Sequence, residues 1–290
     1  MTEEDPFRCR VCGSSTASLI FDNLPDRLQR MPGRFAYVRC TTCDLVQLEK
    51  TPADLGRYYK GYGRHQPESL PYAVFRRLIT GTYYVMPRAS GSSRRLLDYG
   101  CGNGWYVKAM KQRGWDVFGY EFDAKFARAL SARVGVPVVS NLSELDSMAG
   151  SFDLITMNFV FEHLDQPVEA MASVLRLLRP GGEAVLAVPN LDGREAKVFG
   201  RRWFHLDPPR HIVHFNKKQL CQFLTDHGFS NPQVRDLPMA TGFAGSLSYV
   251  VFGHLHPALW YPGILPGLFW TLFVRDGLFR VTASKPASPS

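Results

Sequence analysis

Residues 96–104 read Leu-Leu-Asp-Tyr-Gly-Cys-Gly-Asn-Gly, which predicts a buried strand that turns at once into a helix. Gly100, Gly102 and Gly104 carry no Cβ atom, so the backbone can turn sharply there and come close to a ligand. The G-x-G-x-G spacing differs from the dinucleotide fingerprint G-x-G-x-x-G, and no Lys-Ser/Thr pair follows as in a P-loop. Asp98 precedes the turn, where an acid would repel a pyrophosphate but suits a cationic ligand.

A second acid follows about one βαβ unit later. Residues 116–121 read as a strand that ends in Glu121, and an acid at that place accepts hydrogen bonds from ribose hydroxyls. A glycine-rich turn alone is a weak signal, because a generic doubly wound domain carries one too. The two acids, without a run of phosphate-binding groups, indicate a nucleoside ligand that is not a dinucleotide.

These motifs resemble those of the class I S-adenosylmethionine-dependent methyltransferases, over roughly residues 94–235. Residues 98–104 look like their first motif, 152–158 like their fourth strand, and 179–182 like the turn before their fifth. The resemblance implies an α/β fold with a Rossmann-like seven-stranded sheet, and S-adenosyl-L-methionine as cofactor. The cofactor contacts it implies are Asp98, Gly100, Cys101, Gly102, Gly104, Glu121, Phe122, Asn141, Asn158 and Tyr62.

The composition limits the class of protein. A chain of 290 residues with 45% hydrophobic residues is long enough for one α/β domain with small additions. The net charge of +8 favours anionic partners without choosing among nucleic acid, phosphorylated substrates and acidic membranes. The first five residues are polar and acidic, unlike a secretory signal, so we expect a cytoplasmic protein.

Four of the six cysteines form a repeated pattern, Cys9-x-x-Cys12 and Cys40-x-x-Cys43. Each pair can offer two thiolates from one tight turn, and two such turns complete the tetrahedral four-sulfur site that suits Zn²⁺. A redox C-x-x-C is the competing interpretation, but redox chemistry would not need two copies. A closed four-thiolate site has no open position for chemistry, so we expect a structural zinc ribbon.

Three parts follow from these patterns: a zinc ribbon at 1–50, a helical connector at 51–93 and a methyltransferase domain at 94–285. Alternating strand and helix patterns in the last part predict a parallel sheet with right-handed crossovers. We expect strands near 94–99, 116–121, 136–140, 152–158, 183–190, 233–238 and 278–284. We expect helices near 104–113, 123–133, 167–178 and 217–227.

The segment 240–274 is an apolar insert before the last strand. No Asp, Glu, Lys or Arg occurs between 237 and 274, but Pro257, Pro262 and Pro266 interrupt the run. A straight membrane-spanning helix is therefore disfavoured. Two short helices in a membrane interface or over an apolar substrate fit the pattern, as do two buried helices under a partner subunit. The insert would leave the sheet at the edge where ligands bind. In the peripheral-membrane interpretation, the protein would lie at the inner face of the membrane.

Histidines cluster in the segments that follow the fourth and fifth predicted strands. His163 and His211 are candidate bases, because the pKa of histidine lies near neutrality, and Glu162 is a third catalytic candidate. His205, Arg210 and His214 are candidate substrate contacts. The alternatives stay open: Glu-His-Leu at 162–164 shapes the cofactor pocket, His205 and His214 cap turns, and Arg210 belongs to a solvated basic face.

The whole arrangement resembles a bacterial group of methyltransferases with an N-terminal zinc ribbon, linked to polysaccharide, lipid or secondary-metabolite synthesis. That resemblance rests on the two cysteine pairs, Tyr58-Tyr59-x-x-Tyr62, residues 162–164 and Pro209-Arg210-His211. It implies O- or N-methylation of a sugar, a lipid-linked intermediate or another small molecule. An RNA methyltransferase and a non-catalytic cofactor-binding protein are the alternatives, although scattered basic residues make a nucleic-acid partner unlikely.

Overall fold

A seven-stranded sheet forms the centre of the computed structural model, which describes residues 7–60, 84–87 and 94–287. The strand order is β10-β11-β8-β7-β4-β5-β6, and β11 alone runs in the direction opposite to the other six strands. The strands span β4 Arg95–Tyr99, β5 Asp116–Tyr120, β6 Val138–Val139, β7 Phe152–Asn158, β8 Leu178–Pro189, β10 Ser230–Leu237 and β11 Leu278–Ser284. The expected Rossmann-like sheet is confirmed.

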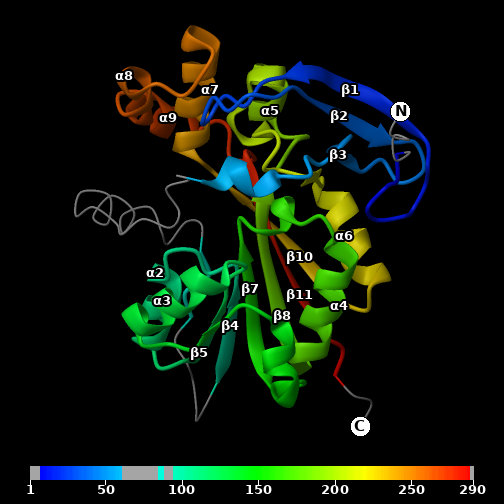
Figure 1. Ribbon diagram of the computed structural model, residues 1–290, viewed down its shortest axis with the longest axis vertical. Helices are drawn as coiled ribbons and strands as arrows, with labels where there is room; N and C mark the ends of the chain where they lie inside the picture. Colours follow the sequence, from blue (N-terminus) through cyan, green and yellow to red (C-terminus); the bar gives the residue numbers. More distant parts are fainter. Residues whose placement is uncertain (1–6, 61–83, 88–93, 288–290) are drawn as a thin grey trace.

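Helices cover both faces of this sheet, as its buried strands require. Helices α2 (Trp105–Lys111) and α3 (Ala124–Val134) lie on one face, and α4 (Pro167–Leu177) and α6 (Lys217–Asp226) on the other (Figure 1). Local signals set their ends. The Asp123 side chain accepts a hydrogen bond from the Phe126 N–H at the start of α3, and Gly135 ends that helix at φ +62°.

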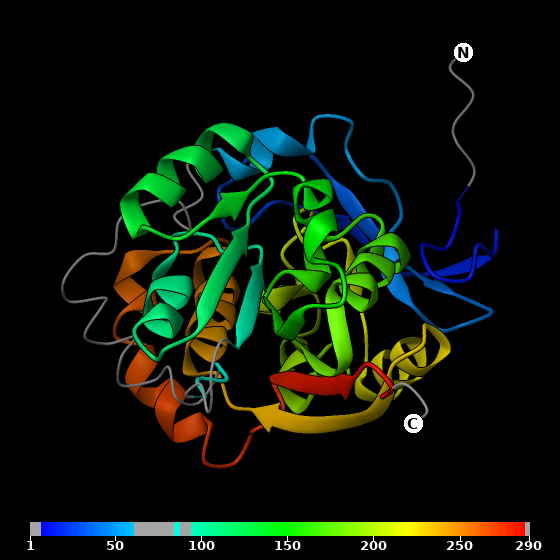
Figure 2. The ribbon, with the colours of Figure 1, turned by 90° about the horizontal axis from the view of Figure 1, so that it is seen from below.

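The apolar insert connects β10 to β11, and Figure 2 shows these two strands side by side. Because β11 is antiparallel to both β10 and β8, β10 runs parallel to the rest of the sheet. The insert therefore leaves from the edge that holds the glycine turn, as expected. It forms three helices rather than two: α7 (Ala240–Phe252), α8 (Pro257–Trp260) and α9 (Ile264–Trp270). None of the helices in the described part of the chain is both long and apolar enough to cross a bilayer.

The N-terminal strands form a second sheet that includes part of the methyltransferase domain. Its order is β1 (Ala17–Leu24), β2 (Phe35–Cys40), β3 (Val46–Leu48) and β9 (Val213–His214), all antiparallel. The last pairing joins Val46 to His214, so the N-terminal region forms one body with the histidine-rich loop. Nothing in the sequence indicated this pairing.

Several expectations differ in detail from the structure. The turn expected at 179–182 lies inside β8, where the pairing with β7 jumps from Phe152–Leu178 to Leu154–Glu183 because the intervening residues bulge out. The third parallel strand contains two residues. Of the helical connector expected at 51–93, the described residues contain one short 3-10 helix, η1 (Leu55–Tyr59), and 61–83 lie outside them. Short helical segments elsewhere are η3 (Leu142–Met148), η4 (Phe161–His163), α5 (Arg194–Phe199), η5 (Gly200–Arg202) and η6 (Phe204–Leu206).

Candidate active site

The glycine turn after β4 needs glycine for both conformation and space. Gly100, Gly102 and Gly104 have φ values of +76°, +52° and +79°, in the left-handed region that other residues avoid. A Cβ atom on Gly100 would lie 2.5 Å from Cγ2 of Val160, and one on Gly104 would lie 2.7 Å from Cδ1 of Leu130. The sequence motif therefore corresponds to a tightly packed turn.

Asp98 lies at the end of β4, directly before this turn, and is 4% exposed. Its Oδ1 accepts a hydrogen bond of 2.7 Å from the Thr156 hydroxyl on the neighbouring strand β7. Burial raises the pKa of this carboxyl to about 7, against hydrogen bonds from Thr156 and Asn158 that lower it. A cationic ligand here would favour the ionised form, as the sequence argument required.

Glu121 follows β5 and holds the turn from the other side. Its Oε2 accepts a hydrogen bond from the Gly102 N–H at 3.0 Å, and its Oε1 accepts one from the Phe122 N–H at 3.1 Å. Phe122 is 86% exposed, and such a ring offers a face on which an adenine can stack. An acid beside a glycine turn and an exposed ring fit an adenosyl group.

Three of the remaining cofactor candidates, Asn141, Asn158 and Cys101, lie at the same edge of the sheet, where their side chains cap, hydrogen-bond or pack within the protein. The Asn141 side chain caps η3 by accepting from the Ser143 N–H at 3.0 Å, and Asn158 ends β7 with its amide buried beside Asp98. Cys101 is buried, and burial raises the pKa of its thiol, so it acts as a small packing residue in the turn. Tyr62 lies outside the described residues.

Val160 connects the glycine turn to the histidines. It packs against Gly100, and its carbonyl accepts from the His163 N–H at 2.9 Å through the single turn of η4. His163 therefore lies within one helical turn of the residue that contacts the predicted cofactor turn. Its neighbour Glu162 is buried, and the Glu162 carbonyl accepts from the Ile212 N–H at 2.7 Å.

The rings of His163 and His211 pack edge to face, with centroids 4.7 Å apart and an angle of 82° between their planes. His163 Nδ1 lies 2.8 Å from the Arg210 carbonyl, and His211 Nδ1 lies 2.7 Å from the His205 carbonyl. A carbonyl oxygen only accepts, so both Nδ1 atoms donate and both Nε2 atoms carry the basic lone pair. The His163 side chain as a whole is half-buried, but its Nε2 atom is buried, and His211 is 4% exposed.

The surroundings of His211 and His214 lower the pKa values of both side chains. Burial, reinforced by the nearby His163, His214 and His205, lowers the pKa of His211 well below its ordinary value. Burial also lowers the pKa of His214 to about 4, and its ring packs 5.2 Å from that of Tyr37. These two histidines are neutral at pH 7. His205 is buried too, with its ring 5.5 Å from that of Trp203.

Arg210 differs from the expectation of a substrate contact. The side chain is fully buried, and its guanidinium binds the carboxylates of Asp26 and Asp207, each at 2.6 Å in its shortest contact. The attraction of both carboxylates outweighs burial and raises its pKa. Because two carboxylates already neutralise this charge, Arg210 fixes the loop in place rather than binding an anionic substrate.

A family model for a methyltransferase domain matches residues 72–234, which is more than half of the chain. The chain belongs to this methyltransferase family. The resemblance to class I S-adenosylmethionine-dependent methyltransferases is thereby confirmed.

Curated relatives carry a more specific name. The ubiquinone biosynthesis O-methyltransferase of Pseudomonas aeruginosa strain UCBPP-PA14 is 32% identical over 114 residues, which cover 37% of this chain and 49% of the relative. The protein of the same name from Saccharophagus degradans is 32% identical over 158 residues, 50% of this chain and 67% of the relative. This chain spans about half the length of the first of them.

Solved structures support the fold. A SAM-dependent methyltransferase from Archaeoglobus fulgidus matches 79% of this chain and 99% of its own, with a TM-score of 0.51 and 15% identity. A chain in the complex between the Haloferax volcanii Trm112 methyltransferase activator and the putative methyltransferase matches 79% and 96%, with a TM-score of 0.54 and 14% identity. At such identities these structures establish the class I fold alone.

The methyltransferase surrounds its histidines with residues of the N-terminal region that sequence reasoning missed. The Tyr37 hydroxyl on β2 lies 2.5 Å from the His211 carbonyl and 2.7 Å from the Leu206 carbonyl. The Tyr59 hydroxyl lies 3.1 Å from His163 Nδ1. The Tyr58-Tyr59 pair was the only sequence signal, because Tyr37 and Asp26 lie in no motif.

The four cysteines converge at the end of the N-terminal sheet. Cys9 Sγ lies 3.5 Å from Cys43 Sγ, Cys12 Sγ lies 3.6 Å from Cys40 Sγ, and all four sulfurs lie within 4.8 Å of one another. Sulfurs bound tetrahedrally at ~2.3 Å from zinc would be separated by about 3.8 Å. The donor set and spacing fit zinc. Glu162, His163 and His211 also offer ligand atoms within 4.8 Å of one another, so they are a second group able to approach an ion.

Proposed function

We propose that this methyltransferase transfers the methyl group of S-adenosyl-L-methionine to an oxygen atom of a small-molecule acceptor, with His163 as the base. The observation that carries the proposal is the contact of Val160 with Gly100, one turn before His163. The names of the curated relatives support oxygen as the acceptor atom. A sugar or lipid-linked hydroxyl belongs to the same proposal, and an amine is the alternative.

The cofactor supplies a methyl group on a cationic sulfur, and the protein aligns it with the acceptor. Asp98 and the glycine turn hold the cofactor end of the site. At the other end, His163 Nε2 takes the acceptor's proton, because Nδ1 is held by the Arg210 carbonyl. With the cofactor bound, the acceptor oxygen would receive its methyl group, the proton would remain on His163, and S-adenosylhomocysteine would be the leaving product.

His211 and Glu162 serve as positioning residues in this proposal. A histidine with a strongly lowered pKa is a weak base, so His211 supports His163 by packing against its ring. Glu162 holds η4 against residue 212 through its backbone carbonyl. His205 and His214 form the wall behind them.

A closed tetrahedral site also supports a structural role for zinc at the four cysteines. We propose that this zinc holds the N-terminal sheet, and through β9 the histidine-bearing loop.

The test compares His163→Gln with a control, His227→Gln. His227 is a half-buried histidine at the end of α6, where its Nδ1 bonds to the Phe223 carbonyl, away from the site. Transfer of a tritiated methyl group to panels of hydroxyl-bearing and amine-bearing aromatic and sugar acceptors measures activity, and calorimetry measures affinity for S-adenosylmethionine. Loss of a general base lowers turnover about 10²- to 10⁴-fold.

We expect that loss for His163→Gln, with unchanged cofactor affinity and a normal control. Near-normal turnover would remove His163 as the base, and transfer to amines alone would replace oxygen with nitrogen. Cofactor binding without transfer to any acceptor would favour a non-catalytic protein. Salt-sensitive binding of bulk RNA, followed by its methylation, would favour the RNA alternative.

A further inference from the structure

The outer surface of the insert exposes large apolar side chains. Nine of the thirteen exposed large hydrophobic residues in the described ranges fall between 250 and 273. Six of the nine are Phe252, Tyr261, Leu265, Phe269, Leu272 and Phe273, each 41% to 74% exposed. An apolar patch of this kind on a protein surface marks an interaction site. We call these six residues the apolar patch.

Close packing of small residues anchors the insert that carries the patch. A Cβ atom on Gly245 would lie 2.3 Å from the Phe204 ring, and one on Gly267 would lie 2.4 Å from the Ala240 carbonyl oxygen. Helix α7 thus lies directly on η6, and α9 lies directly on the start of α7. Figure 1 shows α7, α8 and α9 grouped at one end of the molecule, and α7 contacts both other helices. The residues of the apolar patch are the large side chains that this packed unit leaves exposed.

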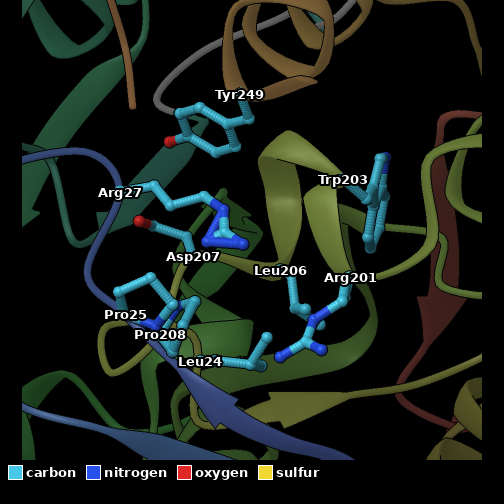
Figure 3. Close-up of a pocket in the computed structure, with 9 residues that line it drawn as sticks. All are labelled: Leu24, Pro25, Arg27, Arg201, Trp203, Leu206, Asp207, Pro208 and Tyr249. Carbon is cyan, nitrogen blue, oxygen red and sulfur yellow. The ribbon is translucent and has the colours of Figure 1, made fainter. Parts of the chain in front are cut away.

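Arginines gather beside the insert. Arg30 and Arg34 line one surface cleft together with Phe252 and His254. Arg27 and Arg201 line a second, smaller pocket with Tyr249 of α7 (Figure 3). The Leu255 N–H donates to the Arg27 carbonyl at 3.0 Å, which ties the insert directly to this loop.

The charges in this margin repel one another. Burial lowers the pKa of Arg27, and Arg201, Arg202 and Arg34 lower it further. The two acids that line these pockets, Asp26 and Asp207, both bind Arg210, and Arg201 donates to the backbone carbonyl of Asp22. We call Arg27, Arg30, Arg34, Arg201 and Arg202 the basic margin.

We propose that the apolar patch and the basic margin dock this methyltransferase on an anionic lipid surface. Apolar and aromatic side chains would enter the boundary between headgroups and acyl chains, while the arginines would contact lipid phosphates. A basic margin beside an apolar face matches that surface in charge and polarity. A second copy of this chain would bring the same arginines toward one another.

Docking in this way places the site next to the lipid. Helix α7 begins beside His205, because a Cβ atom on Gly242 would lie 2.8 Å from His205 Nε2. An acceptor carried by a lipid would reach the histidine-bearing edge without leaving the membrane surface. That acceptor class rests on the proposed methyl transfer, whereas the docking does not.

Vesicle flotation tests the docking with the full-length, zinc-loaded protein. The probes are vesicles of phosphatidylcholine alone and of phosphatidylcholine with 30 mol% phosphatidylglycerol. The apolar variant is Leu265→Gln/Phe269→Gln/Phe273→Gln, and the basic variant is Arg30→Gln/Arg34→Gln. A control, Leu19→Gln/Val234→Gln, replaces exposed apolar residues elsewhere. All these positions are exposed, so the variants should fold, and circular dichroism checks this.

We expect the wild type to float with the anionic vesicles and to be released by salt. The basic variant should partition about 10- to 30-fold more weakly, since each arginine near such a surface contributes ~1 kcal/mol. The apolar variant should lose binding to the anionic vesicles, and the control should behave as wild type.

No flotation of the wild type with anionic vesicles would overturn the proposal. So would a dimer in analytical ultracentrifugation that the apolar variant dissociates, because the patch would then be a protein interface. Flotation needs neither cofactor nor acceptor, so its failure is distinct from a failure of methyl transfer.

Discussion

The two ends of the proposed active site are built in different ways. The centre of the cofactor end comes from consecutive elements, β4, the glycine turn and β5, so Asp98 and Glu121 lie within 25 positions of one another. The histidine-bearing end joins residues from β2, η1, η4 and the loop 203–214. The hydrogen bond from the Tyr37 hydroxyl to the His211 carbonyl, for example, joins residues that are 174 positions apart in the sequence. The first end depends on local backbone geometry, whereas the second depends on the N-terminal sheet.

Removal of zinc should separate the two ends most strongly. Cys40→Ser breaks the four-sulfur site, and a small metal module depends on its ion for folding. We expect methyl transfer to fall below detection, while affinity for S-adenosylmethionine changes little because Asp98 and Glu121 remain in place. Metal analysis, calorimetry and turnover measure these effects. Cys221→Ser on α6 is the control, and equal loss of cofactor affinity and turnover would refute the separation.

Arg210→Ala should destabilise the histidine-bearing end by about 3–5 kcal/mol, because the buried Asp26 and Asp207 lose their shared cation. Arg179→Ala removes an ion pair with Asp153, but the Arg179 side chain is 42% exposed. This change should therefore lower the free energy of unfolding by only about 0–1 kcal/mol. Urea unfolding compares the two variants. Equal costs would mean that the Arg210 pairs do not hold the loop.

Gly100→Ala tests the cofactor end. Alanine at positive φ costs ~1–2 kcal/mol, and the new Cβ would also displace Val160. Gly150→Ala has a similar φ of +70° but nothing within 4 Å of its Cβ, so it isolates the backbone term. We expect both variants to lose stability and only Gly100→Ala to lose affinity for S-adenosylmethionine. Unchanged affinity in both would place the cofactor elsewhere.

A more gradual effect, spread over about three pH units, is a pH dependence from Asp98. Its pKa of about 7 in the folded protein lies above the ordinary value of 3.8, so the folded state holds the proton more tightly. Its contribution to stability is complete below about pH 4 and is lost as the pH rises to 7, with a slope of at most ~1.4 kcal/mol per pH unit.

Urea unfolding of the cofactor-free protein at pH 4.5–7.5 measures that slope. Glu195 also has a pKa raised by burial to about 7, so the difference between wild type and Asp98→Asn isolates Asp98. Asp98→Asn should show a flatter profile. In the wild type, the affinity for cationic S-adenosylmethionine should rise through the same pH range, because ionised Asp98 attracts it. Parallel profiles would assign the titration to Glu195.

Residues 96–104 and 116–121 predicted the glycine turn and the two strands beside it, because each signal lies within a few residues of its structural effect. The seven-stranded sheet was an implication of the family resemblance, and the exit of the insert followed from the strand expected at 233–238. The cysteine pairs likewise predicted a convergent four-sulfur cluster. Arg210 could not be interpreted from its basic neighbours, since its partner Asp26 lies 184 positions away and in no motif. The pairing of β3 with β9 involves two residues of each strand, too few for a periodic pattern.

That short pairing also orders events during synthesis. The thiolates of Cys9, Cys12, Cys40 and Cys43 leave the ribosome first, but the open edge of β3 has no partner until Val213 and His214 emerge. Metal capture can therefore precede the last step of the N-terminal sheet by more than 150 residues of translation. A nascent chain halted before residue 213 would have a metal-bound cysteine cluster but an unpaired edge on β3. Such an edge can pair with a strand of another chain, so this state is the one most prone to aggregation.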